Sequence, residues 1–236
     1  MKKNIIPAIL CAATLSLPSL AQPQDHKMPM PDLNQVNMPL FQTKYTADPS
    51  PLVVGDTLFL YTSHDASPED IPDPNERNSA GFFMYDWLLW STTDMANWTE
   101  YGACASLKEF KWRSRENGAW AIQTVERNGK YYLYAPLHGH GIGVLVADSP
   151  YGPFKDPLGE PLVWQKEHWD DIDPSVFTDA DGQAYMYWGN PELYCVKLNK
   201  DMVSYSGDIV KFPKIRDYQE GPRFYKRGDW YYLAFA

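Results

Sequence analysis

Short apolar runs rich in aromatic residues recur four times along the chain, and a glycine turn precedes each of them. The copies read Gly55-Asp-Thr-Leu-Phe-Leu-Tyr, Gly129-Lys-Tyr-Tyr-Leu-Tyr, Gly182-Gln-Ala-Tyr-Met-Tyr and Gly228-Asp-Trp-Tyr-Tyr-Leu. A tight turn followed by such a run is typical of a β-hairpin that leads into a buried strand. The distances between the copies suit propeller blades of about 40–50 residues with insertions of different length. The repeat therefore predicts an all-β fold of the propeller type.

Alternating polar and apolar positions around these turns predict a unit of four strands. We expect them at 50–54, 57–63, 82–91 and 98–103, then at 120–126, 131–136 and 142–147, with 149–157 turning back towards a fourth, and then at 175–178, 184–188, 193–198 and 208–212. A fourth copy starts at Glu220 and stops midway at Ala236, so about three and a half units are present. A closed propeller needs at least four blades. We therefore expect this chain to be the front part of a longer protein.

Three acidic residues, Asp48, Asp173 and Glu220, stand just ahead of three of the four hairpins. Proline follows each acid, directly or after one glycine, and is expected to hold the preceding residue in an extended conformation. Equivalent positions of successive blades surround one axis, so we expect the three carboxyl groups to share a pocket. Asp-Pro and Glu-Gly-Pro are also ordinary turn elements, but their register with three hairpins favours a functional site.

Four further residues are candidates for contact with a ligand in this pocket. Trp120 leads the second copy at the place that the acids hold in the others, and it fits either a sugar-stacking wall or a core position. His64 and Asn190 fall in loops expected on the pocket face, where each can bind a sugar hydroxyl, solvent or a turn. Trp87 is included although its strand is expected to be buried. No residue is proposed as a metal ligand.

The start of the chain and its composition indicate where the protein is located and which partners it does not bind. Residues 1–21 have a charged start, an apolar middle and small residues at the end, which predicts a signal peptide, then a leader over 22–44 and the propeller over 45–236. We expect a secreted or periplasmic protein with no membrane span. The formal net charge of −9 argues against binding to nucleic acid. Cys104 and Cys195 lie in different copies of the repeat. The sequence allows either a disulfide between them or two free thiols, and it favours the free thiols.

Carboxyl groups gathered in one pocket point to acid–base chemistry. Cleavage of a glycosidic bond needs one protonated carboxyl to donate to the leaving oxygen and one ionised carboxyl to activate water or attack carbon. A third acid nearby raises the pKa of the donor by repulsion between like charges. Phosphate-binding loops and zinc-type spacings of Cys and His are absent from the sequence, so no cofactor is expected.

Seven short segments of the chain resemble glycoside hydrolase family 43, over about 45–236. They are Tyr45-Thr-Ala-Asp-Pro, Tyr61-Thr-Ser-His-Asp, Ser91-Thr-Thr-Asp-Met-Ala-Asn-Trp, Ala119-Trp-Ala-Ile-Gln, Asp171-Ile-Asp-Pro-Ser-Val-Phe, Tyr187-Trp-Gly-Asn and Glu220-Gly-Pro. The resemblance implies a five-bladed propeller that removes xylose or arabinose from plant cell-wall oligo- or polysaccharides. It also implies that Asp48 is the general base, Glu220 the general acid and Asp173 the residue that tunes and orients the acid.

Inversion of the anomeric centre in one displacement is implied as well. The resemblance requires no cofactor and allows a structural calcium. Three other readings of the sequence stay open: a glycan-binding propeller without catalysis, a retaining fructan or sucrose hydrolase, and an inactive truncated fragment. The sequence does not distinguish xylose from arabinose.

Overall fold

Each of the four glycine turns joins two antiparallel strands, as the sequence predicts. The hairpins are β1 (Tyr45–Val54) with β2 (Thr57–Asp65), β5 (Gln123–Arg127) with β6 (Lys130–Pro136), β8 (Ser175–Thr178) with β9 (Ala184–Trp188), and β12 (Arg223–Arg227) with β13 (Trp230–Ala234). Gly55, Gly129, Gly182 and Gly228 have φ angles from +60° to +83°. This left-handed conformation carries little cost for glycine, which is why glycine stands at each turn.

The computed structural model describes residues 40–67, 82–114, 116–166, 169 and 171–236. The account below concerns the unit Phe41–Ala236. The predicted signal peptide and most of the predicted leader lie outside the described residues. Within the described residues, no helix is long and apolar enough to cross a membrane.

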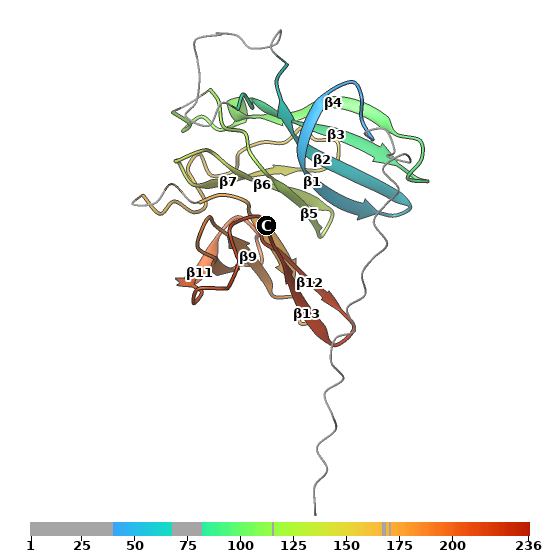
Figure 1. The fold of residues 1–236 in the computed structure, drawn as a ribbon. Coiled ribbons are helices and arrows are strands. Elements are labelled where there is room, and N and C mark those ends of the chain that lie inside the picture. Colours follow the sequence, from blue (N-terminus) through green and yellow to red (C-terminus); the bar gives the residue numbers. More distant parts are fainter. Residues whose placement is uncertain (1–39, 68–81, 115, 167–168, 170) are drawn as a thin grey trace, which may run out of the picture. The chain divides into compact units, whose positions relative to one another are not determined.

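The described strands form four antiparallel sheets in chain order (Figure 1). The first contains β1, β2, β3 (Asp86–Thr92) and β4 (Thr99–Ser106), and the second contains β5, β6 and β7 (Ile142–Ala147). The third runs from β8 and β9 to β10 (Tyr194–Leu198) and β11 (Tyr205–Lys211), and the fourth is the hairpin β12–β13. One turn of 3-10 helix, Leu107–Glu109, follows β4. The fold is therefore all-β, as expected.

The second sheet lacks the expected fourth strand. In its place, Lys155 and Val163 form isolated bridges to Val146 and Ile142. Pro153, Pro157 and Pro161 interrupt this stretch. A proline cannot donate a backbone hydrogen bond, so a regular ladder cannot form there.

Aromatic and aliphatic side chains fill the spaces between successive sheets. On β6, Tyr131 and Leu133 face a cluster shared with the first sheet, whereas Tyr132 and Tyr134 face a cluster shared with the third. A third cluster joins Tyr187 of β9 to the last hairpin. Strands covered on both faces carry continuous apolar runs instead of alternation. This explains the unbroken aromatic sequences after the glycine turns.

The first strands of the sheets lie beside one another, and side chains fasten each one to the next. The backbone N–H of Thr124 donates to Ser50 Oγ (3.2 Å), and that of Phe224 donates to Ser175 Oγ (3.4 Å). Between these two contacts, the Gln123 amide bonds to both the N–H and the carbonyl of Val176. The starts of β1, β5, β8 and β12 are thereby brought to one place, where the candidate site lies.

Candidate active site

A cavity of about 1070 Å³ opens where the first strands begin, and all three predicted acids line it. Trp120 and Asn190 also line it. Loops that follow second strands contribute His138 and Asn190, as the repeat predicts for the pocket face. The structure thus brings together five of the seven predicted site residues.

Two of the acids occupy equivalent positions, and the third is offset by one residue. Asp48 and Asp173 have φ angles of +53° and +57°, and Gly221 has +63°; each directly precedes a proline. Gly221, and not Glu220, is therefore the structural counterpart of the two aspartates. The extended conformation expected before proline is wrong at Asp48 and Asp173, because both residues adopt the left-handed region that aspartate tolerates better than most residues.

Asp48 lies in a bulge that turns it into the cavity. Between the pairs Ala47–Ser63 and Ser50–Tyr61, two residues of β1 oppose the single residue Thr62 of β2. A bulge of this kind redirects a side chain. The Ser63 hydroxyl donates to Asp48 Oδ2 over 2.8 Å. One carboxylate oxygen is therefore held, and the other is available to a ligand or to water.

Burial and charge raise the pKa of Asp173 to about 7. Burial is the largest cause, and the nearby Glu220 and Asp48 add to it. The backbone N–H of Gly221 donates to Asp173 Oδ2 (3.0 Å) and works in the opposite direction. Asp173 therefore retains a proton up to neutral pH, next to two other carboxyl groups.

Asn190 orients the carboxyl group of Glu220. Its Nδ2 donates to Glu220 Oε2 over 2.6 Å, and its Oδ1 accepts from Gln219 Nε2 over 3.0 Å. The Asn190 side chain is buried. Because its carbonyl oxygen is already engaged, its amide group is directed at Glu220. In sequence this asparagine was a candidate for direct sugar contact, whereas the structure shows it bound to a carboxyl group.

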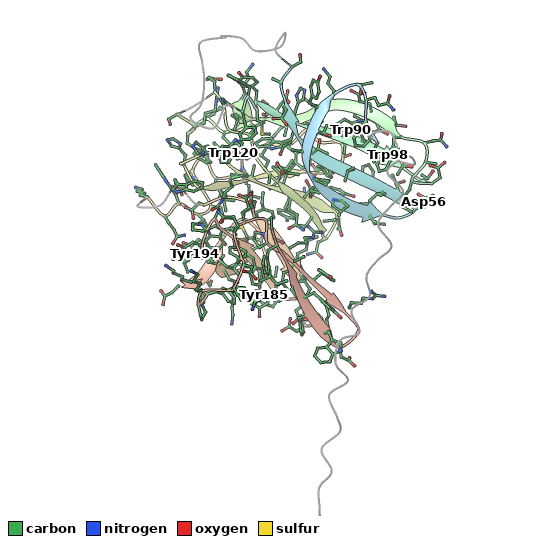
Figure 2. All side chains as sticks on the ribbon, in the orientation of Figure 1. Asp56, Trp90, Trp98, Trp120, Tyr185 and Tyr194 are labelled. Carbon is green, nitrogen blue, oxygen red and sulfur yellow. The ribbon has the colours of Figure 1, made fainter. Side chains whose placement is uncertain are left out.

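Three rings form a wall of the cavity. Trp120, labelled in Figure 2, lies 4.2 Å from the His138 ring, and that ring lies 6.3 Å from Trp169. Trp169 is 51% exposed. When the repeats are aligned, Trp120 occupies the position of Glu220, which lies one residue before the position of Asp48. Trp169 and His138 are not among the residues proposed from the sequence, because no repeat marks Trp169 and a single loop histidine is not a specific signal.

The structure does not place Trp87 or His64 among the residues that line the cavity. Trp87 is fully buried, and its Nε1 donates to the carbonyl oxygen of Trp120 (2.8 Å), so it supports the wall from behind. His64 belongs to β2, and its Nδ1 lies 2.6 Å from Asp86 Oδ1. Side chains alternate along a strand, so the neighbouring Asp65 lines the cavity in its place.

Neither the described carboxylates nor the described histidines suggest a metal centre. Among the residues that the structure describes, no group of three or more His, Cys, Asp or Glu side chains could hold a metal ion. The structural calcium that the resemblance allows stays a prediction, and no step below depends on it.

Known proteins resemble this chain both in sequence and in structure. The sequence profile of glycosyl hydrolases family 43 matches residues 37–236. Xylosidase/arabinosidase 43A of Humicola insolens is 37% identical over 158 residues, which cover 64% of this chain and 45% of that protein. A xylosidase/arabinosidase of Bacteroides ovatus is 34% identical over 151 residues, or 61% of this chain and 43% of that protein. The chain thus spans less than half the length of these relatives.

Two solved structures show the same fold. An α-L-arabinofuranosidase from Clostridium thermocellum has a TM-score of 0.67 and 37% identity, over 83% of this chain and 65% of that chain. A β-xylosidase/α-arabinofuranosidase from a compost microbial metagenome, in complex with xylotriose and free of calcium, has a TM-score of 0.72 and 27% identity, over 84% of this chain and 72% of that chain. With three carboxyl groups in one cavity and the profile matched over most of its length, the chain belongs to glycosyl hydrolases family 43.

Proposed function

We propose that the protein is an exported glycoside hydrolase that releases xylose or arabinose from plant cell-wall xylan or arabinan-type glycans, with inversion in a single displacement. The observation that carries this proposal is the convergence of Asp48, Asp173 and Glu220 on one cavity. The names of the relatives support the substrate class, because they include xylosidases, arabinosidases and an arabinofuranosidase. In this proposal residues 1–21 direct export.

The four sheets are consecutive blades of a five-bladed propeller, and about three and a half of these blades belong to this chain. The first strands surround the axis, and the cavity lies at one end of it. This arrangement explains why residues from three distant parts of the sequence meet in one site.

Asp48 serves as the general base. The Ser63 hydroxyl holds Oδ2, so Oδ1 takes the proton from a water molecule that attacks the anomeric carbon. Attack of water on the face opposite to the leaving group inverts the configuration. The two acting carboxyl groups of such enzymes lie about 6.5–9.5 Å apart, which leaves room for this water.

Glu220 serves as the general acid. Asn190 occupies Oε2, so Oε1 carries the proton that passes to the leaving oxygen. Asp173 lies beside it, and burial, with the charges of Glu220 and Asp48 adding to it, raises the pKa of Asp173 to about 7 and so keeps a proton next to the acid up to neutral pH. The ring wall of Trp120, His138 and Trp169 offers apolar surface to the C–H faces of a sugar.

Hydrolysis of aryl pentosides tests the proposal. The full chain should release 4-nitrophenol from 4-nitrophenyl α-L-arabinofuranoside or β-D-xylopyranoside, and Asp48→Asn should lower the rate by about 10³-fold or more. Proton NMR of the first-formed sugar should show the inverted anomer. Formation of the retained anomer would exclude a single displacement, and binding of xylotriose without any hydrolysis would favour a glycan-binding protein.

A further inference from the structure

A fourth carboxyl group, that of Asp65, belongs to the cavity. Asp65 is the last residue of β2 and pairs with Tyr45 of β1. Ser63, two residues earlier on the same face of the strand, donates to Asp48 Oδ2. His64, on the opposite face, pairs with Asp86. The strand therefore directs Asp65 to the side on which Asp48 lies, and Asp65 lines the cavity together with Phe82 and Met84.

The backbone around Asp65 is held in place. The N–H of Ala66 donates to the carbonyl oxygen of Phe83 (2.8 Å), which ties the end of β2 to the segment that carries Phe82 and Met84. The segment is also held at Met84, whose backbone N–H donates to Asn117 Oδ1 (2.9 Å). Asp65, itself half-buried, consequently stands on a backbone that hydrogen bonds hold in place.

The carboxylate of Asp65 differs from the other three in its hydrogen bonds. Ser63 donates to Asp48, Gly221 to Asp173 and Asn190 to Glu220. No described residue donates a hydrogen bond to the side chain of Asp65, which is half-buried. Burial raises the pKa of Asp65, and the charge of Asp48 raises it further. A carboxylate kept beside another one without donors is costly for folding, and such costs concentrate at functional sites.

We propose that Asp65 is a specificity-determining residue that accepts a hydrogen bond from a hydroxyl group of the sugar bound beside Asp48. This inference rests on the proposed function, because it concerns the same cavity. A sugar hydroxyl supplies the donor that the protein does not, and a hydrogen bond to a carboxylate is stronger than one between neutral groups. The hydroxyl in question belongs to the sugar ring that carries the attacked carbon, since Asp48 activates the water there.

A competing role for Asp65 is purely electrostatic. Its charge could act on Asp48 alone and set the pH at which the base ionises. Removal of Asp65 would then move the acidic limb of the pH profile and leave the preference among sugars unchanged. Acceptance of a hydroxyl makes the opposite prediction, because a site built to bind a hydroxyl rejects analogues that lack it.

The test compares parent sugars with deoxy sugars in the full chain and in Asp65→Ala, Asp65→Asn and Asp86→Asn. Asp86→Asn is the matched control, because it removes the carboxylate that pairs with His64 on the opposite face of β2. The substrates are 4-nitrophenyl α-L-arabinofuranoside and β-D-xylopyranoside with their 2-deoxy and 3-deoxy analogues. For one hydroxyl, the wild-type ratio of kcat/KM, parent over deoxy, should be about 10- to 100-fold larger than in Asp65→Ala. Asp65→Asn should be intermediate, and Asp86→Asn should match the wild type.

The same ratios in the wild type and in Asp65→Ala would overturn the inference. Calorimetric binding of free L-arabinose, D-xylose and their deoxy forms gives a second readout that needs no turnover. If the protein hydrolyses none of the substrates but its binding ratios depend on Asp65, the proposed function fails and the inference stands. If it hydrolyses them with ratios independent of Asp65, the inference fails alone. A protein that binds none of these sugars contradicts both.

Discussion

Each carboxyl group that lines the cavity has its own local environment, although the sequence presents three of them as copies of one motif. Asp48 is held by a serine hydroxyl, Asp173 by a backbone N–H and Glu220 by an asparagine amide. The first two share a left-handed backbone position before proline, whereas Glu220 stands one residue earlier. Different donors and different positions allow similar groups to perform different steps.

The roles of Glu220 and Asp173 can be separated by the leaving group. An activated aryl oxide departs without a proton, whereas a sugar or alkyl oxide needs one. Glu220→Ala should therefore lower kcat/KM for alkyl pentosides or oligosaccharides at least about 100-fold more than for 4-nitrophenyl pentosides. Asp173→Ala should slow both classes to a similar extent. Because Asp173 itself holds a proton up to neutral pH, the reverse pattern would assign the acid to Asp173.

Asp173→Asn should stabilise the fold in a pH-dependent way. The folded-state pKa of Asp173 is raised from 3.8 to about 7, so the folded protein binds more protons than the unfolded chain in this interval and loses stability as the pH rises. Asparagine removes this penalty and retains an acceptor for Gly221. The melting temperature of the variant, relative to the wild type, should be almost unchanged near pH 4, rise towards pH 7 and stay constant above it.

Asp94→Asn is a control of opposite sign for this experiment. Hydrogen bonds from Asn97, Ala96 and Thr92 hold the pKa of Asp94 well below its usual range. The stability that Asp94 contributes is present above the unfolded-state pKa and is lost as the pH falls through the folded-state value. The variant should therefore be less stable than the wild type at neutral pH. A difference in melting temperature between Asp173→Asn and the wild type that did not vary with pH would contradict the raised pKa of Asp173.

Single residues were the least predictable level. The three acids followed from a motif repeated in register, and the structure places them in one cavity. His64 is a candidate in the sequence because it falls in a loop expected on the pocket face, whereas in the structure its neighbour Asp65 lines the cavity. The phase of β2 decides which of the two neighbours faces the cavity, and it could not be read from the sequence, because the strand is buried on both faces from Phe59 to Ser63. The burial expected for the strand of Trp87 is confirmed, since both faces of β3 are covered.

Elements were predicted well where turn and strand signals agreed. All four hairpins form at the glycine turns, and β7 and β9 match their expected ranges. The strand expected from Phe82 starts only at Asp86, because the backbone N–H of Met84 bonds to Asn117 and its carbonyl accepts from Gly118 and Ala119. These partners come from another part of the chain, so local pattern could not reveal them.

Side-chain contacts between first strands should differ in strength. Gln123→Ala would leave the N–H and the carbonyl of Val176 without their side-chain partner in a buried place, and should destabilise the fold by about 2–4 kcal/mol. Ser175→Ala removes one long contact, of 3.4 Å to Phe224, and should cost less than about 1 kcal/mol. Denaturant titration at equal m-values provides the comparison. Equal losses in both variants would show that these contacts do not join the sheets as inferred.

At the scale of the whole molecule, function depends on bringing distant segments together. Asp48, Asp173 and Glu220 lie far apart in sequence, and the side chains of Ser50, Gln123 and Ser175 fasten the strands that carry them. The sequence could predict this convergence because the hairpins repeat. The extra glycine before Pro222 already marks the offset of Glu220 in the sequence, but only the backbone shows that Gly221 takes the left-handed position of the aspartates. The sequence could not place Trp169, which belongs to no repeated unit.

The two cysteines of the described fold should report on its integrity as a unit. Cys104 of β4 and Cys195 of β10 are free thiols in different sheets. Burial is the main cause that raises the pKa of Cys104 to about 12 and that of Cys195 to about 11. Since only the thiolate reacts readily, alkylation by iodoacetamide at pH 8 should be slower in the native protein than in guanidinium chloride, by roughly 100-fold at Cys195 and roughly 1000-fold at Cys104. Peptide mass spectrometry measures each site separately.

A reductant should leave the melting temperature unchanged, because no disulfide joins these residues. Rapid native labelling of one cysteine would show that its sheet opens independently, and a lowered melting temperature would show a disulfide. Either result would contradict a fold that holds two unreactive free thiols in separate sheets.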